Sequence, residues 1–297
     1  MTRAEALERL RTRLRAAGIQ PANQEAEWLL AHALETSVSA LWKDKTALLD
    51  PTQEDALEAL TRRRERREPL QLILGEMPFH HVTLQVEPGV FIPRPETEEL
   101  VEAVLEALGG DVVDRGRAPD PRRLLDLGTG TGAIAIALLH ALPGWQGVAV
   151  DRSPLAVALA ARNAHRNGVG ERLRTMIGDF TSPASAPWEP DGPFDLVVSN
   201  PPYIRRGDIP GLMPEVRDHD PVEALDGGPD GLDALRQLAA RLTAWLRPGG
   251  HLALEIGADQ ADTVLGILSP HIQDARILPD RAGFPRIAIG IQRSGDA

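Results

Sequence analysis

The sequence predicts an α/β fold, a mainly parallel sheet covered by helices, with a small helical region in front of it. Three observations lead to this prediction. The segment Arg123–Leu139 reads as a strand, a glycine-rich turn and a helix in succession. The apolar run Phe194–Ser199 is short and rich in valine and leucine, as are strands buried in a parallel sheet. The first 74 residues instead show apolar side chains at helical spacing.

Residues 1–74 are expected to form a separate helical domain. Helical spacing extends over Ala4–Arg15, Pro21–Leu34 and Thr52–Arg67. The last of these ends in an arginine-rich run, Arg62–Arg67, which is interpreted first as a solvated helix face, with contact to a ribosomal or factor surface as the alternative.

Residues 75–95 are expected to form a β-hairpin linker. His81–Val86 alternates like a strand, and Glu87-Pro88-Gly89 reads as the turn of the hairpin. His80 and His81 have no partner ligands at metal-binding spacing in the sequence, so structural roles are expected for them.

The glycine-rich turn from Asp126 to Gly132 is the first candidate site within the α/β domain, residues 96–297. Gly128, Gly130 and Gly132 alternate with Thr129 and Thr131, directly before the predicted helix. Alternating glycines let the backbone approach a ligand closely, and a helix start offers free N–H groups. Dinucleotide-binding proteins share this logic but use Gly-x-Gly-x-x-Gly spacing, so a different cofactor is indicated.

Two further strand ends carry acidic residues. Gly147–Val150 ends in Asp151, which is placed to accept hydrogen bonds from two ribose hydroxyls, although it could also be a loop acid before the next helix. Asp179 and Phe180 follow the next strand, Leu173–Ile177. Asp179 could accept from an adenine amino group, and Phe180 could stack on the base.

Asn200-Pro201-Pro202-Tyr203 follows the strand Phe194–Ser199 directly. The two prolines end ladder hydrogen bonding, which leaves an amide side chain, free carbonyls and an aromatic ring at the carboxyl end of the strand. Ligands bind at such ends in open α/β sheets. The group could hold a planar amino group, with acceptors in its plane and a ring against its face. An ordinary strand-ending turn is the alternative.

The remaining elements complete the α/β domain. Glu96–Leu108 is expected to be its first helix, followed by a loop from Gly109 to Pro121. Arg205–Asp233 is long and rich in glycine and proline, and either a substrate-facing lid or a surface loop would fit it. The predicted elements after it are a helix over Leu232–Leu246, a strand over His251–Ile256, a helix over Gln260–Leu268 and a strand hairpin over Asp274–Leu278 and Pro285–Ile291.

These motifs together resemble class I S-adenosylmethionine-dependent methyltransferases that act on a planar nitrogen. The segment Phe91–Glu98, the motif order and the helical N-terminal region narrow the resemblance to the peptide chain release factor glutamine N5-methyltransferases, the HemK/PrmC family. The resemblance extends from about Ala4 to Gln292. It implies a Rossmann-like seven-stranded sheet with one antiparallel strand. Phe180 stands where members often carry tryptophan, and His219-Asp220-Pro221 stands where Glu-Pro is usual.

The resemblance implies methyl transfer from S-adenosylmethionine to the glutamine of the Gly-Gly-Gln motif in class 1 peptide chain release factors. The Asn200 side-chain oxygen and the Pro201 carbonyl would accept the two amide N–H bonds, and Tyr203, Pro202 and Phe91 would pack around the amide. Arg94, held between two prolines, would form a wall of the entrance, and it could also pair with Glu96 or Glu98. Asn200 would border the cofactor as well.

Composition limits the alternatives. A nucleic-acid amino methyltransferase could use the same Asn-Pro-Pro-Tyr motif on adenine or guanine. The net charge of −11 disfavours this, and since residues 1–75 carry 12 basic and 12 acidic side chains, all of it belongs to the rest of the chain. A cofactor-binding regulator without turnover is disfavoured by the intact motif. The chain has no cysteine, so a disulfide framework and a thiolate metal site are excluded, which fits the cytoplasm. It also has no apolar run long enough to span a membrane. We expect a cytoplasmic monomer without a metal, a membrane or a stable nucleic-acid partner.

Overall fold

The computed structural model describes residues 1–109, 121–182 and 190–293. The predicted loop Gly109–Pro121 lies almost entirely outside these residues. The contacts divide the chain into two compact units: Met1–Glu76 together with Met213–His219, and the remainder of the chain. The first is called the helical unit below and the second the sheet unit.

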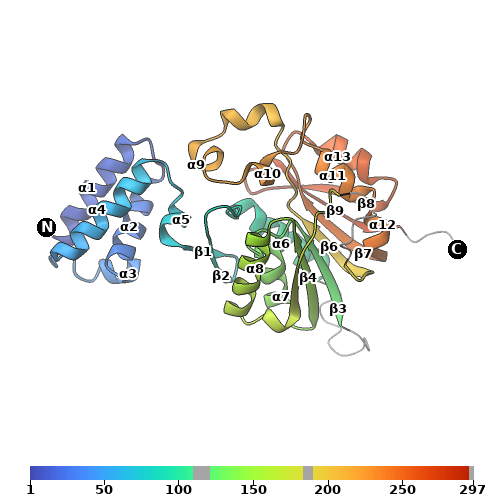
Figure 1. Cartoon of the computed structure of the whole chain (residues 1–297), viewed down its shortest axis with the longest axis horizontal. Helices are drawn as coiled ribbons and strands as arrows, with labels where there is room; N and C mark the ends of the chain where they lie inside the picture. Colours follow the sequence, from blue (N-terminus) through green and yellow to red (C-terminus); the bar gives the residue numbers. More distant parts are fainter. Residues whose placement is uncertain (110–120, 183–189, 294–297) are drawn as a thin grey trace. The chain divides into compact units, whose positions relative to one another are not determined.

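The helical unit contains α1 (Arg3–Ala16), α2 (Ala22–Ala33), α3 (Val38–Leu41), α4 (Pro51–Glu65), α5 (Leu70–Leu74) and α9 (Pro214–Arg217) (Figure 1). Capping boxes start α1 at Thr2 and α4 at Asp50, and each satisfies backbone N–H groups that the first turn leaves free. Leucines and alanines of α1, α2 and α4 form one buried cluster. The three long helices predicted from the spacing are confirmed to within two residues at each end.

The arginine run at the end of α4 has two different environments. Arg62 is an exposed residue that pairs with Glu58 one turn earlier, as expected for a solvated helix face. Arg64, in contrast, is buried and pairs with Glu25 of α2 and Glu215 of α9. The interpretation as a solvated face is therefore wrong for Arg64.

A small hairpin opens the sheet unit: β1 (Glu76–Phe79) pairs with β2 (Val82–Gln85). Its turn lies at His80, which has a positive φ of 51°. The prediction that Glu87-Pro88-Gly89 forms the hairpin turn is wrong, because the partner strand of β2 is β1, which precedes it in the chain. Pro78 lies in β1 and lacks an N–H, which is tolerated because a strand of a two-stranded sheet has a free edge.

The central sheet has seven strands in the order β5-β4-β3-β6-β7-β9-β8 (Figure 1). The strands are β3 (Arg122–Leu127), β4 (Trp145–Asp151), β5 (Leu173–Ile177), β6 (Phe194–Ser199), β7 (Leu246–Glu255), β8 (Ile272–Pro279) and β9 (Pro285–Gln292). Neighbouring strands from β5 to β7 are parallel, and β9 is antiparallel to both β7 and β8. This confirms the Rossmann-like seven-stranded sheet with one antiparallel strand.

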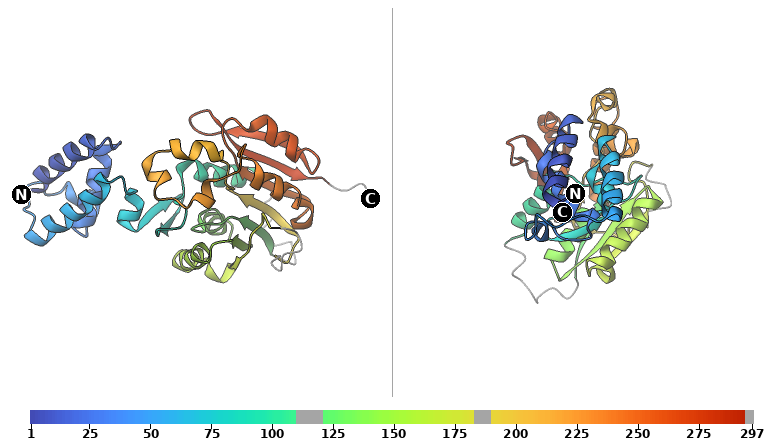
Figure 2. Two further views of the ribbon diagram at one scale, coloured as in Figure 1. Left: turned by 45° about the horizontal axis from the view of Figure 1, so that its top comes forward. Right: turned by 90° about the vertical axis from the view of Figure 1, so that its left-hand side faces the viewer.

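Helices cover both faces of this sheet (Figure 2). One face packs against α6 (Pro95–Ala107), α7 (Ala133–Ala141) and α8 (Pro154–Arg166), and the other against α11 (Asp233–Ala239), α12 (Leu242–Trp245) and α13 (Ala261–Leu268). Successive strand residues alternate between the two cores: Leu124 belongs to one and Leu125 to the other. A sheet buried on both faces explains why its strands are apolar throughout.

One predicted helix differs from the structure. The segment Leu232–Leu246 forms two shorter helices, and β7 already begins at Leu246. The Pro248-Gly249-Gly250 sequence, which was expected to separate helix from strand, lies inside β7, where the pairing with β6 shifts register between Phe194 and Leu196. The pairing resumes at His251 opposite Leu196, so the turn-forming residues lie within β7 at an irregularity of the ladder.

The segment after β6 is also more structured than a simple loop. It contains the 3₁₀ helix η2 (Arg206–Gly211), α9 and α10 (Val222–Leu225). Ile204 pairs with Asp226 as an isolated bridge, which ties the two ends of the segment together. A second 3₁₀ helix, η1 (Gly170–Arg172), precedes β5.

Candidate active site

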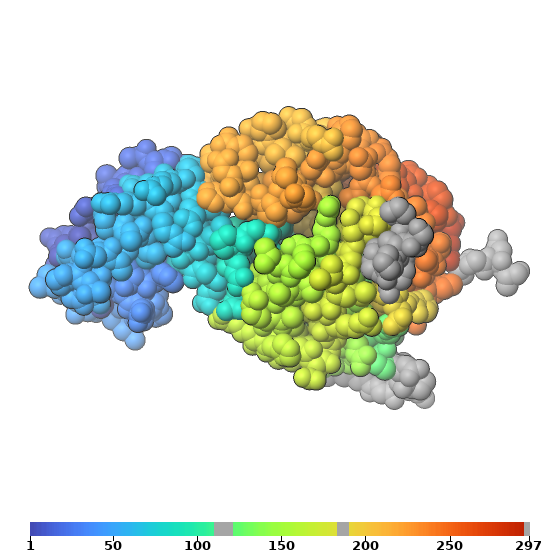
Figure 3. Space-filling view, viewed as in Figure 1, coloured from blue at the N-terminus to red at the C-terminus, as the bar shows by residue number. Residues whose placement is uncertain are grey.

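A cavity of about 380 Å³ lies in the sheet unit at the carboxyl ends of the parallel strands. Figure 3 shows the surface hollowed beneath the gold and orange chain that follows β6. Its lining comes from the glycine-rich turn after β3, the ends of β4, β5 and β6, the linker around Phe91 and α10. The volume is within the range of small-molecule sites, about 300–1,000 Å³.

Most of the predicted site residues line this one cavity: Phe91, Gly128, Thr129, Gly130, Thr131, Asp151, Asp179, Phe180, Asn200, Pro201, Pro202 and Tyr203. The parallel register explains why, since Leu127 lies opposite Val150 and Ser199, so the chain leaves all three strands at the same edge. The lining does not include Arg94, Asp126 or Gly132.

The glycine-rich turn is held by β4. The N–H groups of Gly128 and Thr129 both donate to the Val150 carbonyl, at 2.9 and 3.0 Å. Gly130 has a φ of 57°, and a Cβ built there would meet nothing within 4 Å, so backbone conformation rather than crowding requires this glycine. At Gly132 a Cβ would lie 2.7 Å from Ile136 and 3.2 Å from Ala160, so this glycine permits the contact between α7 and α8.

Asp126 is buried beneath the turn. Its Oδ2 accepts hydrogen bonds from the Thr129 hydroxyl at 2.6 Å and the Ala135 N–H at 3.3 Å. Burial raises the pKa of Asp126 to about 7. Asp126 thus connects the turn to the start of α7 and acts on the cavity through Thr129.

Asp151 lies at the end of β4 and faces the cavity. Its Oδ2 accepts from the Gly130 N–H and its Oδ1 from the Ser153 N–H, both at 2.9 Å. Burial raises the pKa of Asp151 above its ordinary value. Each oxygen keeps further acceptor capacity, so the carboxylate can still bind a ligand hydroxyl.

Asp179 and Phe180 line the cavity after β5. Asp179 Oδ1 accepts from the backbone and the hydroxyl of Thr181, at 2.9 and 2.5 Å, and its Oδ2 lies 3.9 Å from Arg152. The Phe180 ring is buried, and a Cβ added at Gly128 would lie 3.5 Å from its Cε1 atom, so the ring packs beside the glycine-rich turn.

The Asn-Pro-Pro-Tyr motif is anchored by two residues that the sequence analysis missed. Asn200 Nδ2 donates to the Thr97 hydroxyl at 3.2 Å, and that hydroxyl donates to Glu255 Oε2 at 2.7 Å. The Tyr203 hydroxyl donates to the other oxygen, Glu255 Oε1, at 3.1 Å. Glu255 ends the buried strand β7, as Asp151 ends β4, and this similarity of position could have identified it from the sequence.

Burial and polar contacts shift the proton affinities of this network. Burial raises the pKa of Glu255, while its hydrogen bonds from Thr97 and Tyr203 oppose that rise. Burial, and then the negative charge of Glu255, raise the pKa of Tyr203 above its ordinary value. The Tyr203 phenol is therefore a neutral donor, unsuited to act as a base.

Arg94 pairs with Asp220 rather than with Glu96 or Glu98, so the expected salt-bridge partners are wrong. Asp220 is buried and also accepts the Ile92 N–H at 3.2 Å. The guanidinium of Arg94 lies 5.1 Å from the centre of the Phe91 ring. Asp220, to which no role was assigned from the sequence, therefore holds the linker beside Phe91, a residue that lines the cavity.

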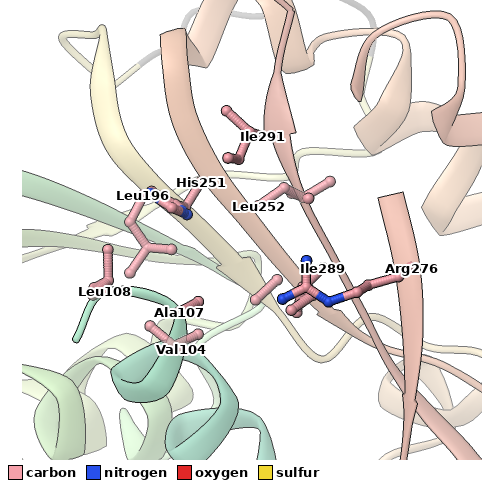
Figure 4. Close-up of a pocket in the computed structure, with 11 residues that line it drawn as sticks. Val104, Ala107, Leu108, Leu196, His251, Leu252, Arg276, Ile289 and Ile291 are labelled. Carbon is pink, nitrogen blue, oxygen red and sulfur yellow. The ribbon is translucent and has the colours of Figure 1, made fainter. Parts of the chain in front are cut away.

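A second cavity, of about 110 Å³, lies away from these strand ends (Figure 4). It is bordered by the last turn of α6, by β6 and β7, and by residues of β8 and β9 that include Arg276 and Ile289. Mainly aliphatic side chains line it, and it shares no residue with the larger cavity.

Three further features concern metal ligands, the adjacent histidines and membrane-spanning helices. Within residues 1–109, 121–182 and 190–293, no group of three or more histidine and acidic side chains is arranged to hold a metal. His80 and His81 contact each other edge to face, with ring centres 4.2 Å apart. No helix in the described part of the chain is long and apolar enough to cross a membrane.

Comparison with known proteins adds to this geometry. Residues 5–75 match the family described as the PrmC N-terminal domain, and residues 82–211 match the methyltransferase small domain. The chain is 40% identical over 288 residues to the release factor glutamine methyltransferase of Cereibacter sphaeroides, covering 97% of each chain. It is 43% identical to that of Geobacter sulfurreducens, covering 85% of this chain and 83% of the relative.

The chain belongs to the release factor glutamine methyltransferase family. A human relative, MTRF1L release factor glutamine methyltransferase, is 37% identical and covers 94% of this chain and 83% of its own. Among solved structures, the catalytic domain of hMettl16 in complex with the MAT2A 3′UTR hairpin 6 matches with a TM-score of 0.55 at 16% identity, covering 86% of this chain and 87% of that one. At this identity the likeness concerns the fold alone.

The chain is thus an S-adenosylmethionine-dependent methyltransferase. The cavity fits this cofactor in three respects. Asp151 offers acceptors to hydroxyls, and there is open space at Gly130 for a ligand to approach the backbone. Thr131 lines the cavity, and its buried hydroxyl has no hydrogen-bond partner among the described residues, which leaves an unsatisfied polar group beside the cavity.

Proposed function

We propose that this protein methylates the side-chain amide nitrogen (N5) of the glutamine in the Gly-Gly-Gln motif of class 1 peptide chain release factors. One observation carries the proposal: Asn200, Pro201 and Tyr203 line the same cavity as the cofactor-side residues Gly130 and Asp151. The names of the relatives support the substrate.

On the cofactor side, we propose that Asp151 accepts from the ribose hydroxyls, and that Asp179 and Phe180 bind the adenine. The backbone of the Gly128–Gly132 turn would line the rest of the cofactor, with Asp126 and Thr129 holding that backbone in place. When bound, S-adenosylmethionine would supply a methyl group on a sulfonium: the nucleophile would take the methyl in line, the C–S bond would break to leave the neutral thioether of S-adenosylhomocysteine, and the methylated nitrogen would lose a proton.

On the substrate side, Asn200 Oδ1 and the Pro201 carbonyl accept hydrogen bonds from the two N–H groups of the glutamine amide. A carboxamide nitrogen is a poor nucleophile, so its orientation and the stabilisation of the positive charge that develops on it provide the catalysis. Tyr203 and Phe91 pack on the amide plane and exclude water, with Pro202 beside them. Arg94 forms the entrance wall through its contact with Phe91.

The helical region, residues 1–74, recognises the release factor, and residues 75–95 link it to the catalytic domain, residues 96–297. Trp28 and Trp42 support this assignment because they are 37% and 42% exposed, and exposed aromatic side chains are common in contact surfaces. The enzyme acts as a cytoplasmic monomer, without a stable nucleic-acid partner.

The test is to incubate the enzyme with tritiated S-adenosylmethionine and either a release factor or total RNA and DNA. We expect label on the release factor, and none on a variant factor whose Gly-Gly-Gln glutamine is replaced by alanine. Label on nucleic acid instead would favour an adenine or guanine amino methyltransferase using the same Asn-Pro-Pro-Tyr motif. No label in any arm would favour a binding protein without turnover.

A further inference from the structure

We propose that Thr97 and Glu255 are positioning residues that fix which end of the Asn200 amide faces the substrate. The inference rests on the proposed function for its consequence in catalysis, but the orientation itself belongs to the enzyme alone. The residues come from three distant parts of the chain: α6, the end of β7 and the turn after β6.

An asparagine amide has two ends of similar size and opposite polarity. Its oxygen accepts hydrogen bonds and its nitrogen donates them, so a half-turn about the last side-chain bond exchanges an acceptor for a donor. For a substrate amide that offers N–H groups, only the orientation with Oδ1 toward the cavity is productive. The flipped orientation would place two donors against each other.

The hydrogen-bond chain selects one orientation. Glu255 is 1% exposed, and as a carboxylate it can only accept. The Thr97 hydroxyl has a single proton and donates it to Glu255 Oε2 at 2.7 Å, so toward Asn200 it can only accept. Asn200 must therefore turn Nδ2 toward Thr97, at 3.2 Å, and Oδ1 is left to accept from the substrate.

The second oxygen of Glu255 extends the same control to Tyr203. Its hydroxyl donates to Oε1 at 3.1 Å, which holds the ring that lines the cavity. One buried carboxylate thus determines the direction of the hydrogen bonds at both polar side chains of the Asn-Pro-Pro-Tyr motif. Each oxygen of Glu255 accepts a hydrogen bond from one hydroxyl, so both hydroxyls keep their partner only while Glu255 remains an acceptor.

The test compares Thr97→Val with Thr97→Ser. Valine keeps the shape and loses the hydroxyl, whereas serine keeps the hydroxyl and loses a methyl group. We expect Thr97→Val to lower kcat on the release factor about tenfold or more, the value of one lost hydrogen bond of about 1.4 kcal/mol, with an unchanged affinity for S-adenosylmethionine. Thr97→Ser should recover turnover to within a few-fold.

A purely structural role for Thr97 predicts the opposite order, since valine fills the buried site better than serine. Equal turnover of both variants, or Thr97→Ser falling below Thr97→Val, would overturn the proposal. Glu255→Gln provides a second test: its amide can donate to Thr97, which frees the Thr97 proton for a flipped Asn200, so a loss similar to that of Thr97→Val is expected. Full turnover of Glu255→Gln would contradict the role of the carboxylate.

A spectroscopic measurement separates this proposal from the proposed function. In the ¹⁵N-labelled enzyme without substrate, the Asn200 side-chain NH₂ signals, assigned by their loss in Asn200→Ala, should shift in Thr97→Val and stay in place in Thr97→Ser. Signals that ignore both substitutions would refute the orientation, whichever substrate is methylated. A normal spectral response with no label on the release factor would instead refute the substrate assignment alone.

Discussion

Two sets of buried charged groups, one in each unit of this protein, have partners of different kinds. In the helical unit, the Arg64 guanidinium lies 2.6 Å from Glu25 and 2.9 Å from Glu215, so opposite charges face each other. In the sheet unit, Glu255 and Asp126 accept from the neutral hydroxyls of Thr97, Tyr203 and Thr129. Each charge of a buried ion pair depends on its partner, because removing one partner leaves the other buried and uncompensated, whereas buried carboxylates with perturbed pKa values recur at functional sites. For these groups, the kind of partner, rather than burial alone, separates structural from functional charge.

The largest expected effect is on stability, at the buried ion pairs of Arg64 with Glu25 and Glu215. Arg64→Met leaves Glu25 and Glu215 buried without their cation and should lower the free energy of unfolding of the helical unit by about 3–5 kcal/mol. Urea unfolding followed by circular dichroism would measure it. Arg62→Met is the matched control on the same helix, because the exposed Arg62–Glu58 pair should contribute less than about 1 kcal/mol. Similar losses for both variants would contradict the structural role assigned to Arg64.

The next effect is on catalysis, at the hydrogen bonds that join Asn200, Thr97 and Glu255. Asn200→Ala removes the acceptor for the substrate amide and should lower turnover by about 10²-fold or more, as when one preorganised polar contact is lost from an active site. Binding of S-adenosylmethionine, measured by calorimetry, should change little. Activity within a few-fold of the wild type would show that Asn200 does not hydrogen-bond the reacting nitrogen.

A smaller effect is expected on cofactor binding. Asp151→Ala removes an anionic acceptor proposed for the ribose and should weaken S-adenosylmethionine binding by about 10–100-fold, the range for hydrogen bonds to a charged group. Calorimetric titration gives the affinity directly. Thermal unfolding should run alongside it, because Asp151 also holds the N–H groups of Gly130 and Ser153. An unchanged affinity in a folded variant would remove the ribose assignment.

A separate effect, measured against pH rather than by a loss of activity, is a slope of stability. Burial raises the pKa of Asp126 to about 7, from an ordinary 3.8, so the folded state holds this proton more tightly than the unfolded state does. The contribution of Asp126 to the free energy of unfolding is therefore greatest below about pH 4 and declines as pH rises toward 7. Asp126→Asn should lack this decline. Urea unfolding of both proteins at several pH values measures it, and parallel curves would show that Asp126 does not titrate in that window.

Local patterns determined a large part of the site in advance. Gly130, Asp151 and Asn200 each follow a strand that its own apolar residues identify, and parallel strands end at a common edge. Their meeting at one cavity therefore follows from the order of strands and turns along the chain. The same reasoning failed at the linker hairpin and at the start of β7, where pairing with another strand overrode the local turn residues.

The sequence by itself thus determined the fold class, the cofactor-side turn and the Asn-Pro-Pro-Tyr motif, because each depends on residues close together in the chain. Only the tertiary structure decided the partners of the buried polar groups. Thr97 meets Glu255 across 158 residues, Arg64 meets Glu215 across 151, and Arg94 meets Asp220 across 126. Neither periodicity nor propensity carries information over such separations, since a hydrogen bond depends on where folding places two side chains and not on their spacing in sequence.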